Sequence, residues 1–473
     1  MNRERNYDAV VVGAGPNGLA AAINLSRRFK SVLVVEAGKN IGGGVRSAEL
    51  TLPGFTHDVC STIQPLALAS PFFRQLELSR YGLEWIQPEI PLAHPFDDGS
   101  ALFLHRNLSL TADGLETDGK AYARLMAPFV ENHEQLLSEI LRPLHVPNNP
   151  LLMARFGFHG LRSLKGLADG YFRNDGTKAF FAGLAAHAMI PLDKPATAAF
   201  GLVLAILAHS VGWPLVRGGS QKLADALADC LRNQGGEIVT ERRIRSMDDL
   251  PPAHFYFFDI TPRQLLDIEG LELSAGYRKR LGRFRYGPGV CKMDWALKEP
   301  IPWKAAVCRK AGAVHLGNSM AEIEAAIHDV SIGRMPSAPY VVLSQQSLFD
   351  ATRAPEGRHT AWAYCHVPHG SDQDVSDLIE KRIEQFAPGF REVIMARSCL
   401  TAAAMELYNA NYVGGDINGG VQDLFQLYTR PVASFNPYRT SVKNVFICSS
   451  STPPGGGVHG LCGYNASRHL SRS

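Results

Sequence analysis

The residues with the clearest chemical signature lie near the start of the chain, where three glycines and one acid follow a fixed spacing. Gly13, Gly15 and Gly18 form the pattern G-x-G-x-x-G, and Glu36 lies about 20 residues further on. In a nucleotide-binding turn, the first glycine permits a tight bend, the second lets the backbone approach a pyrophosphate, and the third lets a helix pack closely on a strand. Glu36 can accept hydrogen bonds from a ribose and would repel a 2′-phosphate. The pattern therefore predicts binding of an adenine dinucleotide.

These residues need a strand, a helix and a second strand to position them, and the sequence contains all three. Residues 9–12 form an apolar run typical of a buried strand, residues 19–25 have helical, alanine-rich spacing, and residues 31–35 form a second apolar strand. The helix N-terminus that follows the glycines presents free N–H groups and a positive dipole end to a phosphate. Because the elements and the glycines agree in register, a simple glycine-rich turn is the less favoured interpretation.

Length and composition indicate a globular protein with more than one domain. The chain has 473 residues, of which 45% are hydrophobic and 20% charged, and its net charge is +3. So small a charge, without a basic cluster, predicts no nucleic-acid partner. The eight cysteines contain no C-x-x-C pair, which favours reduced thiols in a cytoplasmic protein. The first strand begins within about ten residues of Met1, without a signal-peptide pattern.

A second glycine loop follows the acid at residues 42–44, and Pro53, Gly54, Phe55 and Asp58 come after it. This order, an acid, then Gly-Gly, then P-G-F-x-x-D, resembles the FAD-binding module of the phytoene dehydrogenase-related, carotenoid desaturase-like oxidoreductases. They belong to the amine-oxidase-like flavoprotein superfamily. The resemblance implies that the first motif holds the ADP half of FAD rather than NAD. Arg46 lies either near the pyrophosphate or on the surface. The residues implied to contact FAD here are Gly13, Gly15, Pro16, Asn17, Gly18, Glu36, Gly43, Gly44 and Arg46.

The last part of the chain also resembles this family. An apolar run at residues 445–448 is followed by SSSTPPGGGVHGLCGYNASRHL, a glycine-rich turn that enters a helix. This turn resembles the T-x-P-G-x-G-x-x-G element that meets the flavin ring in carotenoid desaturases, although residues 449–451 replace an acid that many amine oxidases carry. The implied flavin contacts are Thr452, Gly456, Gly457 and Val458. In the family, the residue at the position of Ile244 contacts the adenine through its backbone.

Lys292 is a candidate catalytic residue on a predicted strand over residues 290–297, with Asp294 on the same face. The pattern G-x-G-V-x-K, followed by P-x-P-W, resembles the amine-oxidase strand whose lysine holds a water against flavin N5 and assists oxygen chemistry. A solvated lysine paired with Asp294 is an equal alternative. His459, in the final turn, is the second catalytic candidate, as a proton donor or acceptor. Candidates for an aromatic cage beside the flavin are Tyr412, Tyr428 and Trp362.

Residues 196–213 form a run of 18 residues without a charge, which by length alone could cross a membrane. A single crossing would separate two parts of one cofactor domain, so we expect a buried helix beside an apolar substrate cavity, with shallow membrane contact as the alternative. His209 in this run is expected to be a core histidine. His366 and His369 have proline between them and no third ligand nearby, so no metal site is predicted.

The predicted fold is α/β, a Rossmann-type FAD-binding domain of the glutathione-reductase-like and amine-oxidase-like kind with an inserted α+β substrate domain. The expected cofactor domain consists of residues 1–80, 214–290 and 415–473, with a strand pair over residues 235–244. The expected substrate domain consists of residues 81–213 and 291–414.

The predicted function is that of an FAD-dependent oxidoreductase. It desaturates an apolar small molecule, of which an isoprenoid is one example, by hydride transfer to flavin N5, and its electron acceptor is O2 or a quinone. One alternative is an amine-oxidase-like flavin oxidase that uses O2, and another is a flavoprotein with structural FAD that binds a partner. Because the sequence has no C-x-x-x-x-C pair, a disulfide reductase is not predicted, and the absence of G-x-S-x-G argues against a hydrolase. The expected location is the cytoplasm, with membrane association left open.

Overall fold

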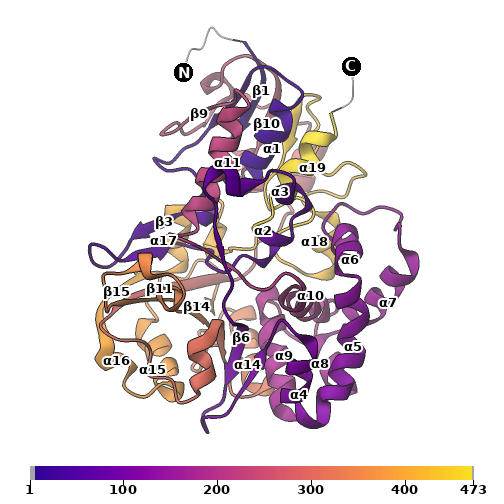
Figure 1. Cartoon of the computed structure of the whole chain (residues 1–473). Helices are drawn as coiled ribbons and strands as arrows, with labels where there is room; N and C mark the ends of the chain where they lie inside the picture. Colours follow the sequence, from indigo (N-terminus) through magenta and orange to yellow (C-terminus); the bar gives the residue numbers. More distant parts are fainter. Residues whose placement is uncertain (1–5, 471–473) are drawn as a thin grey trace.

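The computed structural model describes residues 6–470, which contain two large sheets that share no strand (Figure 1). The first sheet has five strands in the order β16-β10-β1-β2-β9, and all neighbouring strands are parallel. Its central strands are buried on both faces, as their continuous apolar runs predict. Its strands come from distant parts of the chain: β1 (Tyr7–Val12), β2 (Val32–Val35), β9 (Glu237–Val239), β10 (Ala253–Phe258) and β16 (Val445–Ile447).

Three helices from distant parts of the chain pack together beside this sheet. Helix α1 (Pro16–Ser26) follows β1 directly and contacts both α11 (Gln221–Asn233) and α19 (Leu461–Arg468). A side chain at Gly463 would place its Cβ 1.8 Å from the carbonyl oxygen of Asn17, so the approach of α19 to α1 requires glycine there. The C-terminal helix is therefore fixed against the helix that follows the first glycine loop.

The second sheet has seven strands in the order β15-β11-β14-β13-β12-β6-β7. Its pairs are antiparallel except for the parallel pair of β12 and β6. One face packs on α15 (Ser376–Phe386), and the other packs on a group of helices. The predicted α/β fold is confirmed. The strands are β6 (Ile90–Pro95), β7 (Ala101–Leu104), β11 (Gly289–Leu297), β12 (Ala311–Leu316), β13 (Val341–Ser344), β14 (His359–Val367) and β15 (Ile394–Leu400).

The group of helices, which we name the helical cap, lies beside the second sheet and below the first in Figure 1. Its uncharged helix α10 (Thr197–Ser210) contacts the other helices of the cap and is largely buried among them. The apolar run over residues 196–213 is thus interior to the cap. None of the helices within residues 6–470 has the length and apolar character needed to span a membrane. The other cap helices are α5 (Gly119–Glu131), α6 (His133–Ile140), α7 (Pro150–Gly160), α8 (Leu164–Tyr171) and α9 (Asp175–Ala185).

Exposed apolar side chains gather instead on α7 and the loop before it. Leu151, Phe158 and Leu161 keep 87%, 71% and 50% of their surface exposed, and their spacing places them on one side of the helix. Leu144 and Val146, in the preceding loop, are 70% and 89% exposed. The apolar surface that solvent reaches on the cap is therefore on its outer helix.

The predicted strand pair over residues 235–244 is wrong, because only β9 forms a strand there. After β9 the chain turns at Glu241, which has a φ of +58°. The Glu241 and Arg242 N–H groups then donate to the carbonyl oxygens of Gly38 and Glu36, in the loop after β2. Backbone groups that bond to a loop in this way cannot pair with a second strand.

Buried charges join the two sheets at the short strand β4 (Thr56–Asp58). Asp58 lies 3.2 Å from Nη1 of Arg353, and Arg353 Nε lies 3.0 Å from Asp350. All three side chains are buried. Burial alone would raise the pKa of Asp58, but Arg353 and hydrogen bonds from Thr62, Ser220 and Ser47 hold it below its usual range.

We expect Arg353→Ala to reduce the free energy of unfolding by about 3–5 kcal/mol, because it leaves two buried carboxylates without their cation. Urea unfolding measures this loss. The control is Arg217→Ala, which removes an ion pair of 2.7 Å with Glu84 whose side chains are 50% and 66% exposed. Exposed pairs contribute about 0–1 kcal/mol. Equal losses in the two variants would contradict the structural importance given to Arg353.

Candidate functional site

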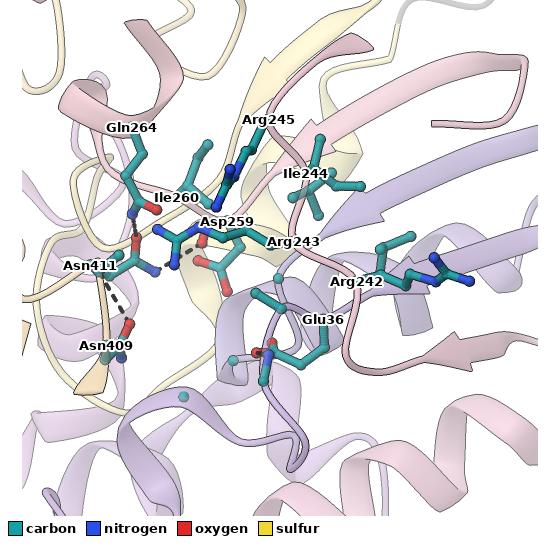
Figure 2. A pocket seen from close by; sticks show the side chains of 18 of the residues that line it. Glu36, Arg242, Arg243, Ile244, Arg245, Asp259, Ile260, Gln264, Asn409 and Asn411 are labelled. Atoms are coloured by element: carbon teal, nitrogen blue, oxygen red, sulfur yellow. Dashed lines mark hydrogen bonds between the residues drawn. The ribbon is translucent and has the colours of Figure 1, made fainter. Parts of the chain in front are cut away.

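A cavity of about 540 Å³ opens at the carboxyl ends of β1, β2 and β10 (Figure 2). Ligands of parallel α/β sheets bind at this edge. The first glycine loop contributes Gly13 and Gly15 to its lining, and the second contributes Gly43. Further walls are formed by residues 242–245 and 407–411, the first of which includes Ile244. We name this cavity the nucleotide groove.

The glycines of the two loops occupy places that a side chain would fill. A Cβ on Gly15 would lie 3.0 Å from the Asp259 carboxylate, and one on Gly43 would lie 3.1 Å from the Cα of Gly15. A Cβ on Gly18 would lie only 2.0 Å from the carbonyl oxygen of Gly13, which agrees with its predicted packing role. The floor of the groove is therefore bare backbone, which is the form that a pyrophosphate requires.

Glu36 is buried at the end of β2 and is fully engaged in hydrogen bonds. Its carboxylate accepts from the N–H groups of Ala14 and Gly38, both at 2.8 Å, and from Arg46 Nη2 at 3.0 Å. The Arg46 guanidinium also lies 5.6 Å from the ring centre of Tyr408. Arg46 thus lies within the groove and is held between an acid and an aromatic ring.

Asp259 is a groove residue that sequence reasoning missed. It follows β10 directly, and its Oδ2 accepts from the Gly18 N–H at 2.8 Å, inside the first turn of α1. Burial, and secondly the charge of Glu36, raise its pKa well above the usual value. Its carbonyl oxygen accepts from the Asn411 amide at 3.1 Å (Figure 2). The available sequence signal was an acid directly after a third predicted strand. The carboxyl ends of parallel strands meet at one edge of a sheet, which brings such an acid near the glycine loops.

Three arginines flank the groove and were also missed. Arg242, Arg243 and Arg245 stand on either side of Ile244 in the segment after β9 (Figure 2). They are consecutive apart from Ile244, so the charge run ERRIR was visible in the sequence. Together with the N-terminus of α1 they bring positive charge to a groove that is also lined by the acids Glu36, Asp259, Asp267 and Glu269, and these positive groups can contact an anionic ligand.

The C-terminal block lies on the same sheet but outside the groove lining. Thr452 is buried and its hydroxyl donates to the Ser449 carbonyl oxygen at 2.7 Å. A Cβ on Gly456 would lie 2.7 Å from the carbonyl oxygen of Asn418. The turn ends at Gly460, which has a φ of +68° and precedes α19. The glycines therefore shape a compact turn next to α1, and Gly457 and Val458 lie within it.

His459 is buried inside this turn. Its Nδ1 accepts from the Leu461 N–H at 3.0 Å, and its carbonyl oxygen accepts from the Ser70 hydroxyl at 2.7 Å. Burial lowers its pKa to about 4, so the ring is neutral at physiological pH. Nε2 has no hydrogen-bond partner among the described residues.

Lys292 is buried on the cap-facing side of β11, with only 2% of its surface exposed. Its ammonium group contacts the carboxylate of Asp294 directly, and His57 Nδ1 lies 3.5 Å from the same carboxylate. The predicted pairing with Asp294 is present, but the alternative of a solvated lysine is wrong, because both side chains are almost fully buried. Burial, opposed by Lys292, raises the pKa of Asp294 to about 6.

The three aromatic cage candidates lie in different surroundings. Tyr412 is buried, shares a hydrogen bond with the thiol of Cys60, and places its hydroxyl 2.6 Å from where a Cβ of Gly44 would be. Trp362 is buried on the second sheet, whereas Tyr428 is 45% exposed. Tyr412 is therefore the candidate beside the second glycine loop.

Comparison with known proteins agrees with this geometry. The family described as NAD(P)-binding Rossmann-like domain matches residues 11–75, which include both glycine loops. A rat protein, pyridine nucleotide-disulfide oxidoreductase domain-containing protein 2, is 26% identical and covers 98% of this chain and 93% of its own length. The 4,4′-diapolycopen-4-al dehydrogenase of Metabacillus indicus is 22% identical and covers 95% of this chain and 93% of its own length.

Solved structures show the same fold. An oxidoreductase from Methanosarcina mazei has a TM-score of 0.67 at 16% identity, over 98% of this chain and all of its own. A putrescine oxidase has a TM-score of 0.65 at 15% identity, over 98% of each chain. The fold and the groove are those of an oxidoreductase. Over most of its length the chain is similar to desaturase-type enzymes, among them the 4,4′-diapophytoene desaturase of Staphylococcus haemolyticus, which is 22% identical over 95% of each chain.

We expect Asp259→Asn to change how stability depends on pH. Folding raises the pKa of Asp259, so its stabilising effect is complete below its unfolded value of about 3.9 and is lost as the pH rises through the folded value. Asparagine keeps an oxygen for the Gly18 N–H but cannot ionise. Relative to this variant, the wild-type protein should lose up to about 1.4 kcal/mol of unfolding free energy for each pH unit between the unfolded value of about 3.9 and the raised folded pKa, and no more above it.

Urea unfolding between pH 5 and 9 measures the difference, with Asp267→Asn at the exposed edge of the groove as the control. Parallel pH profiles of the wild-type protein and Asp259→Asn would refute the expectation.

Proposed function

We propose that this chain binds FAD non-covalently and dehydrogenates an apolar small molecule, with desaturation of an isoprenoid-like carbon chain as the principal reaction. The observation that carries the proposal is the pair of bare glycine loops that lie side by side in the lining of the nucleotide groove. Two full-length relatives are named 4,4′-diapolycopen-4-al dehydrogenase and 4,4′-diapophytoene desaturase, which supports the substrate class. The electron acceptor in this proposal is O2 or a quinone.

In this proposal the groove holds the ADP half of FAD, and the turn before α19 meets the flavin ring. FAD supplies a two-electron acceptor when it is bound. The protein holds it with backbone N–H groups at the start of α1, with Glu36 near the ribose and with Arg46 and Ile244 beside it. The residues assigned to the cofactor are Gly13, Gly15, Pro16, Asn17, Gly18, Glu36, Gly43, Gly44, Arg46, Ile244, Thr452, Gly456, Gly457 and Val458.

The proposed division of the chain follows from the same assignment. The cofactor domain would consist of residues 1–80, 214–290 and 415–473, and the substrate domain of residues 81–213 and 291–414. The first set contains every strand of the parallel sheet. The second set contains every strand of the seven-stranded sheet apart from the first two residues of β11. The apolar interior of the helical cap would then orient the substrate and exclude water.

Lys292 and His459 are the side chains proposed to act near the reacting atoms. Lys292 acts there together with Asp294, its ion-pair partner, so the pair carries no net charge. His459 has an unbonded Nε2–H that can donate a proton, because its Nδ1 accepts from the Leu461 N–H and the ring is neutral.

An amine-oxidase-like oxidase that uses O2 is the second candidate, and the likeness to putrescine oxidase supports its fold. A flavoprotein with structural FAD and a partner-binding role is the third. A cation that assists oxygen reduction should carry an uncompensated charge. Because Asp294 neutralises Lys292, we place the dehydrogenase first.

A cytoplasmic location with peripheral membrane contact is part of the proposal. The contact would be made by the apolar stripe of Leu151, Phe158 and Leu161 on α7, next to Arg155 and Arg162. Co-sedimentation with anionic vesicles should fall in Leu151→Asp/Phe158→Asp. Undiminished sedimentation would remove α7 from this role.

We expect Gly15→Val to abolish FAD binding, because its side chain would press on the Asp259 carboxylate and replace bare backbone in the groove lining, where the pyrophosphate would lie. The measurement is the FAD content of the purified protein, read from visible absorbance. Gly276→Val is the matched control, since a Cβ there meets no atom within 4 Å. Full FAD occupancy in Gly15→Val would overturn the cofactor assignment.

We expect replacement of the Lys292–Asp294 pair to change reoxidation by O2 less than tenfold. The double variant Lys292→Met/Asp294→Asn is compared with the wild-type protein after anaerobic reduction, because Lys292→Met alone would leave a buried carboxylate uncompensated. Stopped-flow absorbance measures the rate. A loss of about a hundredfold or more, the size typical for a lost contact to a developing charge, would favour the oxidase candidate instead.

A further inference from the structure

Hydrogen-bonding side chains line the face of the second sheet that meets the helical cap. Lys292 on β11 is opposite Tyr364 on β14, Tyr364 is opposite Val342 on β13, and Val342 is opposite His315 on β12. These four residues therefore form one row across the sheet, on a single face. Such a row is unexpected in a cavity built only for a hydrocarbon, because buried polar groups need partners.

The row is joined to the cap by His187, in the short turn between α9 and α10. The Tyr364 hydroxyl lies 3.3 Å from His187 Nδ1, and His187 Nε2 lies 3.1 Å from His315 Nε2. One bond fixes each end of the His187 ring. The Tyr364 oxygen has one proton and two lone pairs, so after its bond to His187 it can still bond one further polar atom.

Tyr364 and His187 lie deep in the protein, yet His187 keeps part of its surface accessible, and the same holds for Cys60. Cys60 is hydrogen-bonded to Tyr412 and interacts electrostatically with Tyr364 and Lys292. These side chains therefore lie together between the second glycine loop and the helical cap, and the accessible surface on His187 and Cys60 indicates an internal space beside them.

The charged groups that reach this space neutralise each other. Lys292 is paired with Asp294, and behind them Asp58 is paired with Arg353. The histidines are neutral, because burial lowers the pKa of His187 to about 4. An ammonium or carboxylate group that entered would lose its hydration without gaining a counter-ion, which is strongly unfavourable.

We propose that the substrate is an apolar molecule with one uncharged oxygen function, an alcohol, aldehyde or ketone, which binds to the hydroxyl of Tyr364. His187 and His315 act as positioning residues that hold this hydroxyl in place. The inference rests on the proposed function, since it names the substrate class of the same site. The inference excludes a primary amine and a carboxylic acid as substrates. It also predicts that a plain hydrocarbon binds more weakly than its oxygenated analogue.

The experiment uses the full chain with bound FAD and five ligands that share one branched C10 skeleton. They are geraniol, geranial, geranylamine, geranic acid and 2,6-dimethylocta-2,6-diene. Dissociation constants are measured from the change in flavin absorbance and, in parallel, from tryptophan fluorescence, because Trp362 lies 5.4 Å from the Tyr364 ring centre. We expect geraniol and geranial to bind at least tenfold more tightly than the other three ligands.

Tyr364→Phe should weaken binding of geraniol and geranial about tenfold and leave the affinity for the hydrocarbon unchanged. Tyr122→Phe is the matched control, since it removes another buried tyrosine–histidine contact, that with His209, inside the cap. His187→Gln, which keeps a hydrogen-bonding side chain, should lose less affinity than His187→Leu.

Equal affinity for all five ligands, absence of binding, or an equal loss in Tyr364→Phe and Tyr122→Phe would overturn the inference. A protein that contains no flavin would overturn the proposed function alone, because the fluorescence titration still tests the ligand preference.

Discussion

The buried carboxylate of Asp58 holds the molecule together where its two sheets meet. It accepts hydrogen bonds from Ser47, Thr62 and the Ser220 N–H, at 2.7, 2.6 and 2.8 Å, and it pairs with Arg353. These groups come from segments that are far apart in the chain and belong to both parts of the fold. A charge buried this deeply is tolerated only when its partners are all in place, so the contact fixes the relative position of the second glycine loop and the second sheet.

The neighbouring residue extends this constraint to the candidate catalytic strand. His57 and Asp58 are adjacent on β4, so their side chains point in opposite directions. Asp58 faces Arg353, while His57 lies 3.5 Å from Asp294, the partner of Lys292. Burial, reinforced by the charge of Lys292, lowers the pKa of His57 to about 3, so it adds no charge to the pair. One short strand therefore positions both the domain junction and the buried ion pair beside the internal space.

Local features of the site could be predicted from the sequence, whereas features made by distant segments could not. The first glycine loop, Glu36 and the strand that bears Lys292 depend on spacing within a few dozen residues, and periodicity identifies them. Asp259 lies 241 residues from Gly18, its hydrogen-bond partner, and no local pattern links the two. Lys292 is likewise buried beside His57 of β4, a distant segment, which is why the sequence left a solvated lysine open. The segment after β9 was wrongly predicted as a strand for a similar reason. Its backbone N–H groups bond to the loop after β2, and the periodicity of the segment itself does not reveal this contact.

The distribution of charge separates the two regions of the candidate site. The nucleotide groove combines the start of α1 with three arginines, and Asp259, the acid that bonds the Gly18 N–H, has a raised pKa. That region is suited to an anionic ligand. The internal space beyond it has paired ions and neutral histidines, so its selectivity must come from shape and hydrogen bonds. A dinucleotide provides its own charge and redox chemistry in the first region. The protein can then keep the second region dry and neutral, which is what an uncharged, largely apolar substrate requires.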